Sequence, residues 1–399
     1  MNIIEAYTDK KNIPDATVES KLSYRKKIQL FCKENIESRV GEMDRNCKID
    51  ADLIHLLFEN NLMNIEIPVV YGGLGKTFFD TVVTIEEVAK TDPSIAVFID
   101  VQNSLINNAF LRWGKEFQQK KYLPLLAKSL AGSFSITEEE AGSDTYALSC
   151  KAIPADGGYI LNGKKHWATN ASEAGVFVIF AKITENNPND SITAFIVDKQ
   201  TEGLTVLPPQ EKMGIRASST CDIVLENVYV PEENILGGIG MGKRIALETL
   251  TDGRVGIAAQ MLGLAQGALD LAIAYSQQRK QFGEHIGAFQ GVYFELAKMA
   301  THIEAARQMI YHSVNLKSQG SNFMEYFKQA CMAKYFASDI SEKVASQAVE
   351  IFGGLGFMKS CPVEKFYRDA KIGRIYEGTT NIQLKTIART LLKIKSLNK

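Results

Sequence analysis

The chain has 399 residues, a mass of 44.2 kDa and a formal net charge of −1 at pH 7. A hydrophobic share of 45% with 23% charged residues is ordinary globular composition, which excludes disordered and collagen-like proteins and predicts about two or three domains. Because the charges balance and are spread along the chain, we expect neither a nucleic acid nor an anionic membrane as a partner.

Cysteine usage and apolar stretches bear on location. The sequence has no C-x-x-C pair and no zinc spacing, so we expect no metal and reduced, buried thiols at Cys32, Cys47, Cys150, Cys221, Cys331 and Cys361. Residues 1–20 lack the apolar core of a targeting peptide. The most apolar long stretch, residues 256–274, includes three polar residues and many small ones, which favours a buried helix over a membrane span. We therefore predict a soluble, cytoplasmic protein.

Residues from about 20 to 130 carry helical periodicity. Asp50 is a candidate N-cap for a helix whose apolar face lies between positions 53 and 58. Residues 81–90 show a similar stripe, and Asp92 with Pro93 predicts the start of the next helix, because proline favours the first helical position. We assign residues 1–130 to an N-terminal all-α domain.

The middle of the chain has the pattern of an all-β module, which we assign to residues 131–238. Short runs rich in β-branched and aromatic residues are separated by Gly, Asn, Asp and Pro. The candidate strands are residues 133–137, 159–161, 176–183, 192–197 and 220–225. Asn162 with Gly163 predicts a hairpin turn.

Helical periodicity returns after the β module, in residues 244–278, 288–317 and 323–352. We assign residues 239–399 to a C-terminal helical domain. Strands and helices do not alternate along the chain, which argues against a Rossmann sheet. The predicted fold is therefore an α+β multidomain protein with helices, then a β domain, then helices.

Two segments of the β region could bind a ligand. Residues 134–144 run from a strand into a turn crowded with hydroxyls and carboxylates, which could hold a polar ligand or be a solvated loop. Trp167 could stack on a flat heterocycle, although a buried core tryptophan is the commoner case. His166 is expected on the surface. Residue types alone favour the structural alternative for both segments.

Three C-terminal motifs likewise have both a functional and a structural interpretation. Arg279 could bind a pyrophosphate or only balance a helix dipole. Gly353 and Gly354 could admit a ligand or only end a helix. Glu377 could be a general base whose pKa is raised by apolar surroundings, or a carboxylate that stabilises the following helix N-terminus. Each motif taken singly favours the structural alternative.

Taken in order, the motifs resemble the acyl-CoA dehydrogenase family over nearly the whole chain, and its short-chain, butyryl-type members most closely. Residues 136–144 (ITEEEAGSD) resemble the first signature of the family, and residues 279–283 (RKQFG) and 363–379 resemble its C-terminal signatures. Residues 212–218 (KMGIRAS) and 231–237 (PEENILG) match the exit from its β domain. The resemblance implies an N-terminal helical domain, a middle β-sandwich and a C-terminal four-helix bundle, usually in a homotetramer built as a pair of dimers.

The resemblance also implies FAD, bound between the β domain and the C-terminal helices. The residues that would hold its ring and ribityl chain are Phe134, Ile136, Thr137, Gly142, Ser143, Trp167, Ala168 and Thr169. Those that would come from the neighbouring subunit to hold the ADP half are Arg279, Gln290, Glu350, Gly353 and Gly354, and Phe282 is assigned to the cofactor as well. Thr379, Thr380 and Asn381 would complete the site at a helix start, where N–H groups favour phosphate oxygens.

In the chemistry of the family, Glu377 would remove the α-proton of an acyl thioester while the β-hydrogen leaves as hydride to flavin N5. The Glu377 backbone N–H and a ribityl hydroxyl would hold the thioester oxygen as enolate charge develops. Some branched-chain members carry the base at the position of Gly253, which leaves Glu377 as the candidate here. The residues assigned to the substrate are Ser143, Asp252, Arg254, Tyr376 and Gly378, and candidates for the acyl pocket are Ile99, Val101 and Leu105.

The chain departs from the family pattern at four positions. Thr251 stands where short-chain members usually carry an Asp that touches the CoA arm, and the Asp comes one residue later, about 100° round the helix. Glu139 replaces a Pro, Glu350 replaces a Gln near the neighbouring FAD, and Ala168 is smaller than the usual residue beside the flavin. These departures bear on the substrate more than on the fold or cofactor.

The sequence therefore predicts FAD-dependent α,β-dehydrogenation of a short-chain acyl-CoA such as butyryl-CoA, with electrons passed to an electron-transfer flavoprotein. The alternative is an acyl group tethered to a carrier protein in a biosynthetic pathway, which Thr251 motivates because such a substrate needs fewer CoA contacts. A non-catalytic scaffold and an oxidase that uses oxygen directly are two further alternatives.

Overall fold

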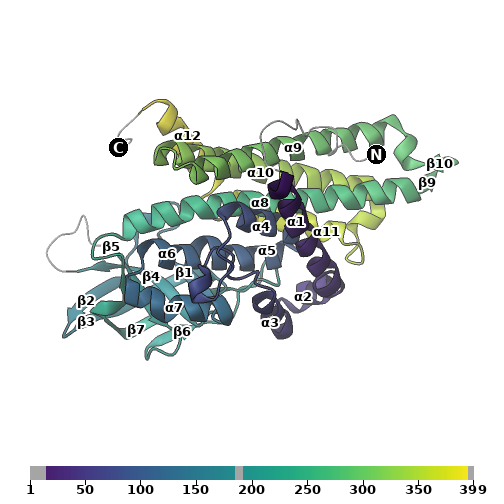
Figure 1. The fold of residues 1–399 in the computed structure, drawn as a ribbon. Coiled ribbons are helices and arrows are strands. Elements are labelled where there is room, and N and C mark those ends of the chain that lie inside the picture. Colours follow the sequence, from purple (N-terminus) through teal and green to yellow (C-terminus); the bar gives the residue numbers. More distant parts are fainter. Residues whose placement is uncertain (1–14, 185–191, 394–399) are drawn as a thin grey trace.

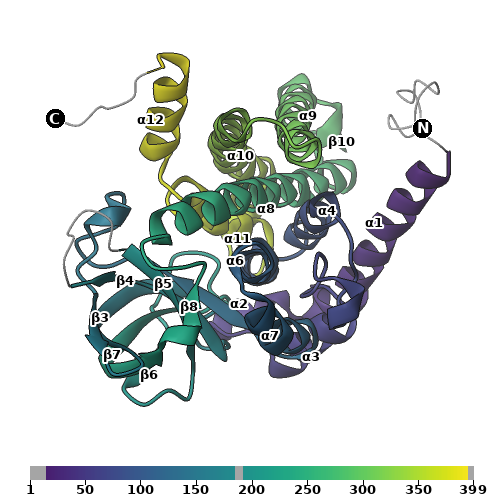
Figure 2. The ribbon, with the colours of Figure 1, turned by 60° about the vertical axis from the view of Figure 1, so that its left-hand side comes forward.

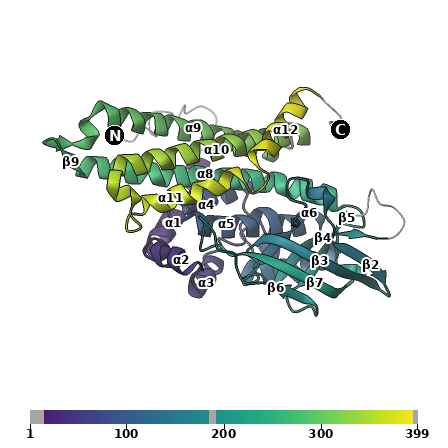
Figure 3. The same cartoon turned by 180° about the vertical axis from the view of Figure 1, so that it is seen from behind.

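The computed structural model describes residues 15–184 and 192–393. Residues 1–14 lie outside this range. They make up most of the segment 1–20, in which the sequence predicts no targeting peptide. In Figure 1 the long C-terminal helices run side by side, and the N-terminal helices and the sheet lie together along one side of them. Figure 3 shows the same arrangement from behind.

The N-terminal region is helical, as predicted. Its helices are α1 (Asp15–Asn35), α2 (Val40–Asn46), α3 (Ala51–Glu59), α4 (Phe78–Ala89), α5 (Pro93–Asp100), the π-helical segment η4 (Val101–Asn107), α6 (Asn108–Trp113) and α7 (Glu116–Lys128). Asp92 caps α5 by accepting a hydrogen bond from the backbone N–H of Ser94 (2.8 Å), and Pro93 is the first helical residue. Asp50 stands at the N-cap of α3, but its side chain makes no capping bond and lies 3.4 Å from Arg39.

The predicted β module is one eight-stranded sheet that curls round its own core. Its strands are β1 (Gly132–Ser135), β2 (Lys151–Ala155), β3 (Gly158–Thr169), β4 (Val176–Ile183), β5 (Ile192–Asp198), β6 (Leu204–Val206), β7 (Thr220–Pro231) and β8 (Ile235–Leu236). The strand order is β6-β7-β3-β2-β4-β5-β8, and β1 pairs in parallel with β4. Side chains of β3, β4, β5 and β7, such as Leu161, Phe177, Phe195 and Ile223, share the enclosed core.

The hairpin turn predicted at Asn162 and Gly163 is wrong. Both residues lie inside β3, where the register with β7 shifts at a bulge. The structure uses glycine there because a Cβ at Gly163 would lie 2.9 Å from the Cα of Cys150. The β2–β3 turn lies earlier instead, at Gly157, which has a positive φ of 68°.

The C-terminal region is a helical bundle, as predicted. Its elements are α8 (Gly242–Gln278), the hairpin strands β9 (Lys280–Gln281) and β10 (Glu284–His285), α9 (Gln290–Ser318), α10 (Phe323–Phe352), α11 (Val363–Ala370) and α12 (Thr380–Leu391). Helices α8, α9 and α10 pack against one another, and α12 packs against α10. Figure 2 shows α8 between these helices and the N-terminal helices α4 and α6.

Helix α8 is the centre of the molecule. It packs against α10 and α9 on one side and against α4 and α5 on the other. A Cβ at Gly263 would lie 2.1 Å from the carbonyl oxygen of Glu86, so glycine lets α4 approach closely. Among the described residues α8 alone is long and apolar enough to cross a membrane, but 72% of its apolar window is buried inside the protein, as expected of a core helix. The six cysteines are free thiols, and all except the partly exposed Cys47 are buried.

Candidate active site

Glu377 lies on a sharply bent loop between η9 (Lys371–Arg374) and α12. Glu377 and Gly378 both have positive φ angles (53° and 88°), and a non-glycine residue adopts this conformation only when its surroundings hold it there. Gln383 supplies part of that hold, since its side-chain amide donates to the carbonyl oxygens of Glu377 (3.1 Å) and Gly378 (2.8 Å). Thr379 caps α12 by accepting a hydrogen bond from the N–H of Ile382 (3.4 Å).

Glu377 is partly exposed as a residue, but one of its carboxyl oxygens is buried. Its Oε2 is buried and unpaired among the described residues, so it does not serve as a helix cap. It rests on α8 at Gly253, where a Cβ would lie 3.0 Å from this oxygen and 2.8 Å from the side chain of Leu105. A side chain at this point would displace the ends of Leu105 and Glu377, so glycine leaves room for the Glu377 carboxyl group.

Burial is the main reason why the pKa of Glu377 is raised, from 4.5 to about 7. The charges of Arg254 and Lys334 oppose this rise. Lys334 is fully buried, and its Nζ donates to the carbonyl oxygen of Gly378 (2.7 Å). Burial lowers the pKa of Lys334 to about 7, against the opposing influence of Glu377. A carboxyl group with this pKa exchanges a proton near neutral pH, as a general base must.

Tyr376 and Arg254 lie against the same part of the molecule. The hydroxyl of Tyr376 is hydrogen-bonded to the side-chain oxygen of Gln260 on α8, and the Gln260 amide donates to the carbonyl oxygen of Pro93 (2.7 Å). Arg254 is buried, its guanidinium stacks on the ring of Phe327 at 5.1 Å, and its Nε is unpaired among the described residues. The loop that carries Glu377 is thus fixed to α8 and, through it, to the start of α5.

Asp252 occupies a different environment from the one predicted. Its carboxylate is fully buried and accepts hydrogen bonds from Asn108 and Tyr326. The cations of Arg112 and Lys317 lie 3.2 and 3.0 Å from it. Because all these partners come from the protein, the placement explains Asp252 as a structural link between helices and does not favour the substrate contact predicted for it.

The flavin-side residues predicted on the sheet lie at the ends of β1 and β3. The two segments are joined by the N–H of His166, which donates to the carbonyl oxygen of Thr137 (2.9 Å). Trp167 is 60% exposed with a positive φ of 54°, so it is not a core tryptophan and its ring is open to a ligand. The hydroxyl of Ser135 is buried and unpaired among the described residues. Phe134, Ile136 and Ala168 are buried, Thr137 and Thr169 are partly exposed, and Gly142 and Ser143 are exposed.

A buried ion pair fixes the loop that follows β1. The Nζ of Lys165, fully buried in β3, lies 2.6 Å from Oε1 of Glu138. The other oxygen of Glu138 accepts from the hydroxyl of Ser149 (2.7 Å), and Oε1 also accepts from the N–H of Cys150 (3.0 Å). The pair therefore ties the loop to β3 and to the segment just before β2.

The residues assigned to the ADP half of FAD lie far from Glu377 within one chain. Arg279 ends α8, 26 residues beyond Gly253, which corresponds to about 39 Å along a helix. Figure 1 shows the β9–β10 hairpin at the opposite end of α8 from the sheet. Phe282 is 96% exposed. The others in this group, Gln290, Glu350, Gly353 and Gly354, are exposed too, as is Asn381, while Thr379 and Thr380 are partly exposed.

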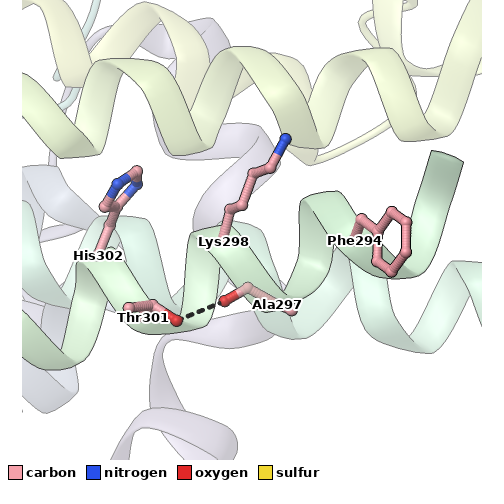
Figure 4. A pocket seen from close by; sticks show the side chains of 5 residues that line it. All are labelled: Phe294, Ala297, Lys298, Thr301 and His302. Carbon is pink, nitrogen blue, oxygen red and sulfur yellow. Dashed lines mark hydrogen bonds between the residues drawn. The ribbon is translucent and has the colours of Figure 1, made fainter. Parts of the chain in front are cut away.

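Surface hollows also occur outside this region. One lies on α9 and is lined by Phe294, Ala297, Lys298, Thr301 and His302 (Figure 4). The Thr301 hydroxyl there bonds the carbonyl oxygen of Ala297 in its own helix (2.8 Å). No group of three or more potential metal ligands occurs among the residues that the structure describes.

Sequence reasoning missed Lys334, Asp100 and the Lys165–Glu138 pair. Lys334 sits in the apolar stretch of α10 between Ala333 and Tyr335, and a lysine in such a stretch is the signal that could have found it. Asp100 similarly ends an apolar run in α5. The Lys165–Glu138 pair joins residues 27 positions apart, and no local pattern indicates such a contact.

Comparison with known proteins agrees with this arrangement. Three protein-family models match the chain. They are the acyl-CoA dehydrogenase N-terminal domain over residues 19–129, the middle domain over residues 133–228 and the C-terminal domain over residues 240–392. A short/branched chain specific acyl-CoA dehydrogenase, mitochondrial, from Bos taurus is 46% identical over 94% of this chain and 86% of its own length.

Two solved structures are similar over most of the chain. Butyryl-CoA dehydrogenase from Megasphaera elsdenii has a TM-score of 0.91 and 36% identity, covering 96% of this chain and 99% of that one. An acyl-CoA dehydrogenase complexed with FAD from Bacillus anthracis has a TM-score of 0.87 and 31% identity, covering 94% of this chain and 66% of that one. The chain therefore belongs to the acyl-CoA dehydrogenase family of FAD flavoprotein oxidoreductases.

Proposed function

We propose that this protein catalyses α,β-dehydrogenation of a short or branched acyl-CoA, with Glu377 as the base that removes the α-proton. The observation that carries the proposal is the buried, unpaired Oε2 of Glu377, together with the pKa of this carboxyl group, which is raised to about 7. An ionised carboxylate with this pKa is a stronger base than an exposed glutamate, and no protein donor competes for its buried oxygen. The short or branched acyl group is inferred from the relatives in cattle and Megasphaera elsdenii.

The residues on the sheet fit FAD. The exposed ring of Trp167 offers a flat apolar surface on which an isoalloxazine ring could stack. Phe134, Thr137, Trp167 and Thr169 would hold the ring and ribityl chain. When bound, FAD supplies the acceptor for the β-hydrogen. The chain itself orients the acyl group, excludes water and holds the α-proton on Glu377.

The ADP half of FAD is assigned to a neighbouring subunit. Arg279, Phe282 and Gln290 are exposed, and Arg279 lies about 39 Å along α8 from the point where Glu377 rests, too far for one cofactor to contact both inside a single chain. A dimer that brings these residues to the partner's sheet would solve this, and two such dimers would form the proposed homotetramer. An electron-transfer flavoprotein is the proposed acceptor, and the cytoplasmic location stays a prediction.

The acyl group of the substrate could be attached to a carrier protein in place of CoA. Thr251 is fully buried and its hydroxyl donates to the carbonyl oxygen of Leu247 (2.6 Å), so neither Thr251 nor Asp252 offers a free group to the CoA arm. A carrier-bound acyl group, which has no adenosine end, would need no such contact. Comparing kcat/KM for the same acyl group on CoA and on a carrier protein separates the two, and a preference for CoA excludes the alternative.

The central test is an anaerobic visible spectrum of the purified protein before and after butyryl-CoA or isobutyryl-CoA. A flavin band that bleaches supports the cofactor, the reaction and the thioester together. Glu377→Gln should keep the flavin band but lose the bleaching, because Gln has the same shape and cannot take a proton. A Glu377→Gln protein that bleaches as the wild type does would exclude Glu377 as the base.

A further inference from the structure

Asp100 is a buried acidic residue for which the reaction described above has no use. It ends α5, at the point where the chain passes into the π-helical segment η4. Its side chain is fully buried, and neither carboxyl oxygen has a hydrogen-bond partner among the described residues. An ionised carboxylate is poorly tolerated without a partner in such a place, whereas a neutral carboxyl group is less costly to bury. Burial without a partner therefore favours the protonated form of the Asp100 carboxyl group.

The position of Asp100 relative to Glu377 follows from two glycines of α8. A Cβ at Gly256 would lie 1.9 Å from Oδ1 of Asp100, and a Cβ at Gly253 would lie 3.0 Å from Oε2 of Glu377. Residues three apart on a helix lie on one face, with Cβ positions about 5–6 Å apart. The two carboxyl groups thus rest on the same face of α8, one turn from each other. Ile99 and Val101, expected in the acyl pocket, flank Asp100 in the sequence.

The charges round the two groups are unequal. Arg254 and Lys334 act on Glu377 and favour its ionised form. At Asp100, the nearby Ser104 hydroxyl acts to lower the pKa and the carboxyl of Glu377 acts to raise it, and Asp100 in turn raises the pKa of the Tyr376 hydroxyl. No described lysine or arginine offsets its burial, which together with the charge of Glu377 raises the pKa of Asp100 well above its usual range.

The elements packed against α5 supply no free cation to Asp100. On α11, the ammonium of Lys365 is held between Asp92 (2.8 Å) and Asp369 (2.6 Å). On α4, the carboxylates Glu86 and Glu87 are paired with Arg25. On α8, the remaining charges near this level are those of Arg254, which acts on Glu377, and of Asp252, which is paired with Arg112 and Lys317. Glu377 is therefore the carboxyl that ionises first.

We propose that Asp100 is a positioning residue of the reaction, because its carboxyl group lies one turn along α8 from that of Glu377 and must carry its proton while Glu377 acts as a base. This inference rests on the proposed role of Glu377. Asp100 neither gives nor takes a proton during turnover. Its ionisation would place a second negative charge beside Glu377 and the developing enolate, which opposes the removal of the α-proton.

The test is the pH profile of kcat/KM for the FAD-loaded wild type and for Asp100→Asn, an uncharged side chain of the same shape. Wild-type kcat/KM should rise through about pH 7 as Glu377 ionises and fall about ten-fold at alkaline pH as Asp100 ionises. Asp100→Asn should keep the rise and lose the fall. Asp270→Asn, the same substitution at an exposed position of α8, should follow the wild type in both limbs.

Two results would overturn the inference. A rise that moves by a unit or more to lower pH in Asp100→Asn would mean that Asp100 is already an anion in the wild type. Profiles that coincide in both limbs would mean that its charge is irrelevant to the reaction. If Asp100→Asn does not retain FAD, Asp100→Ser removes the charge with a smaller side chain and is read in the same way. Failure of the proposed function would instead appear as no flavin bleaching in the wild type.

Discussion

The carboxyl group of Glu377 should make the protein less stable above neutral pH, and Glu377→Gln should remove that loss. In the folded state the pKa is raised from 4.5 to about 7, so the folded protein keeps a proton that the unfolded chain releases between these values. Wild-type stability therefore falls as the pH rises through this window. A shift of this size corresponds to about 3 kcal/mol at pH values above about 8. Because Gln resembles the protonated form of Glu, Glu377→Gln should not show this loss of stability.

The assay is thermal unfolding of both FAD-loaded proteins at about pH 5 and about pH 8.5. With about 2.1 cal/mol/K of unfolding entropy for each of 399 residues, 3 kcal/mol corresponds to a Tm difference of about 4 °C. Glu377→Gln should exceed the wild type by that amount at the higher pH and by about 1 °C at the lower. Glu202→Gln, at an exposed position, serves as the control. Equal Tm values for wild type and Glu377→Gln at about pH 8.5 would refute the reasoning.

Three further substitutions test other parts of the site. Gly253→Ala should lower kcat without loss of FAD, because its Cβ would lie 3.0 Å from the Glu377 carboxylate; stopped-flow flavin reduction measures this, and an unchanged rate would contradict it. Lys334→Met removes a positive charge that lowers the pKa of Glu377, so the rise of kcat/KM with pH should move to higher pH, and movement the other way would disprove the assigned influence. Lys165→Met leaves the buried carboxylate of Glu138 without its cation, which should cost about 3–5 kcal/mol and appear as a lower Tm. Lys151→Met, at an exposed position of β2, should change Tm much less.

The sequence predicted elements well where a local pattern determines them. Asp92 and Pro93 start α5 as expected, because a cap and a proline act within one helical turn. β2 was missed, since it is short and contains Pro154, which weakens a strand pattern. Asn162 with Gly163 misled because the same dipeptide that favours a turn also suits a bulge inside a strand.

The site was harder to predict than the fold, because its chemistry depends on contacts between distant segments. Glu377 could be singled out from its motif, but its state depends on Gly253 and Lys334, which come from two other helices. The sequence alone left Trp167 open between a core and a ligand-stacking role, and only its 60% exposure excludes the core. Asp252 was assigned to the substrate from its motif, but its carboxylate is instead paired with the cations of Arg112 and Lys317 inside the protein.

The central place of α8 has a consequence for how the molecule comes apart. Glycines such as Gly263 bring the backbone of α4 into direct contact with α8, while α9 and α10 cover its other side. The N-terminal helices and the C-terminal bundle therefore share one core helix, and neither can open without exposing it. Amide protons of α4, α8 and α10 should exchange with solvent in a single cooperative event, and a protease cut between the N-terminal helices and the sheet should not release a folded helical fragment.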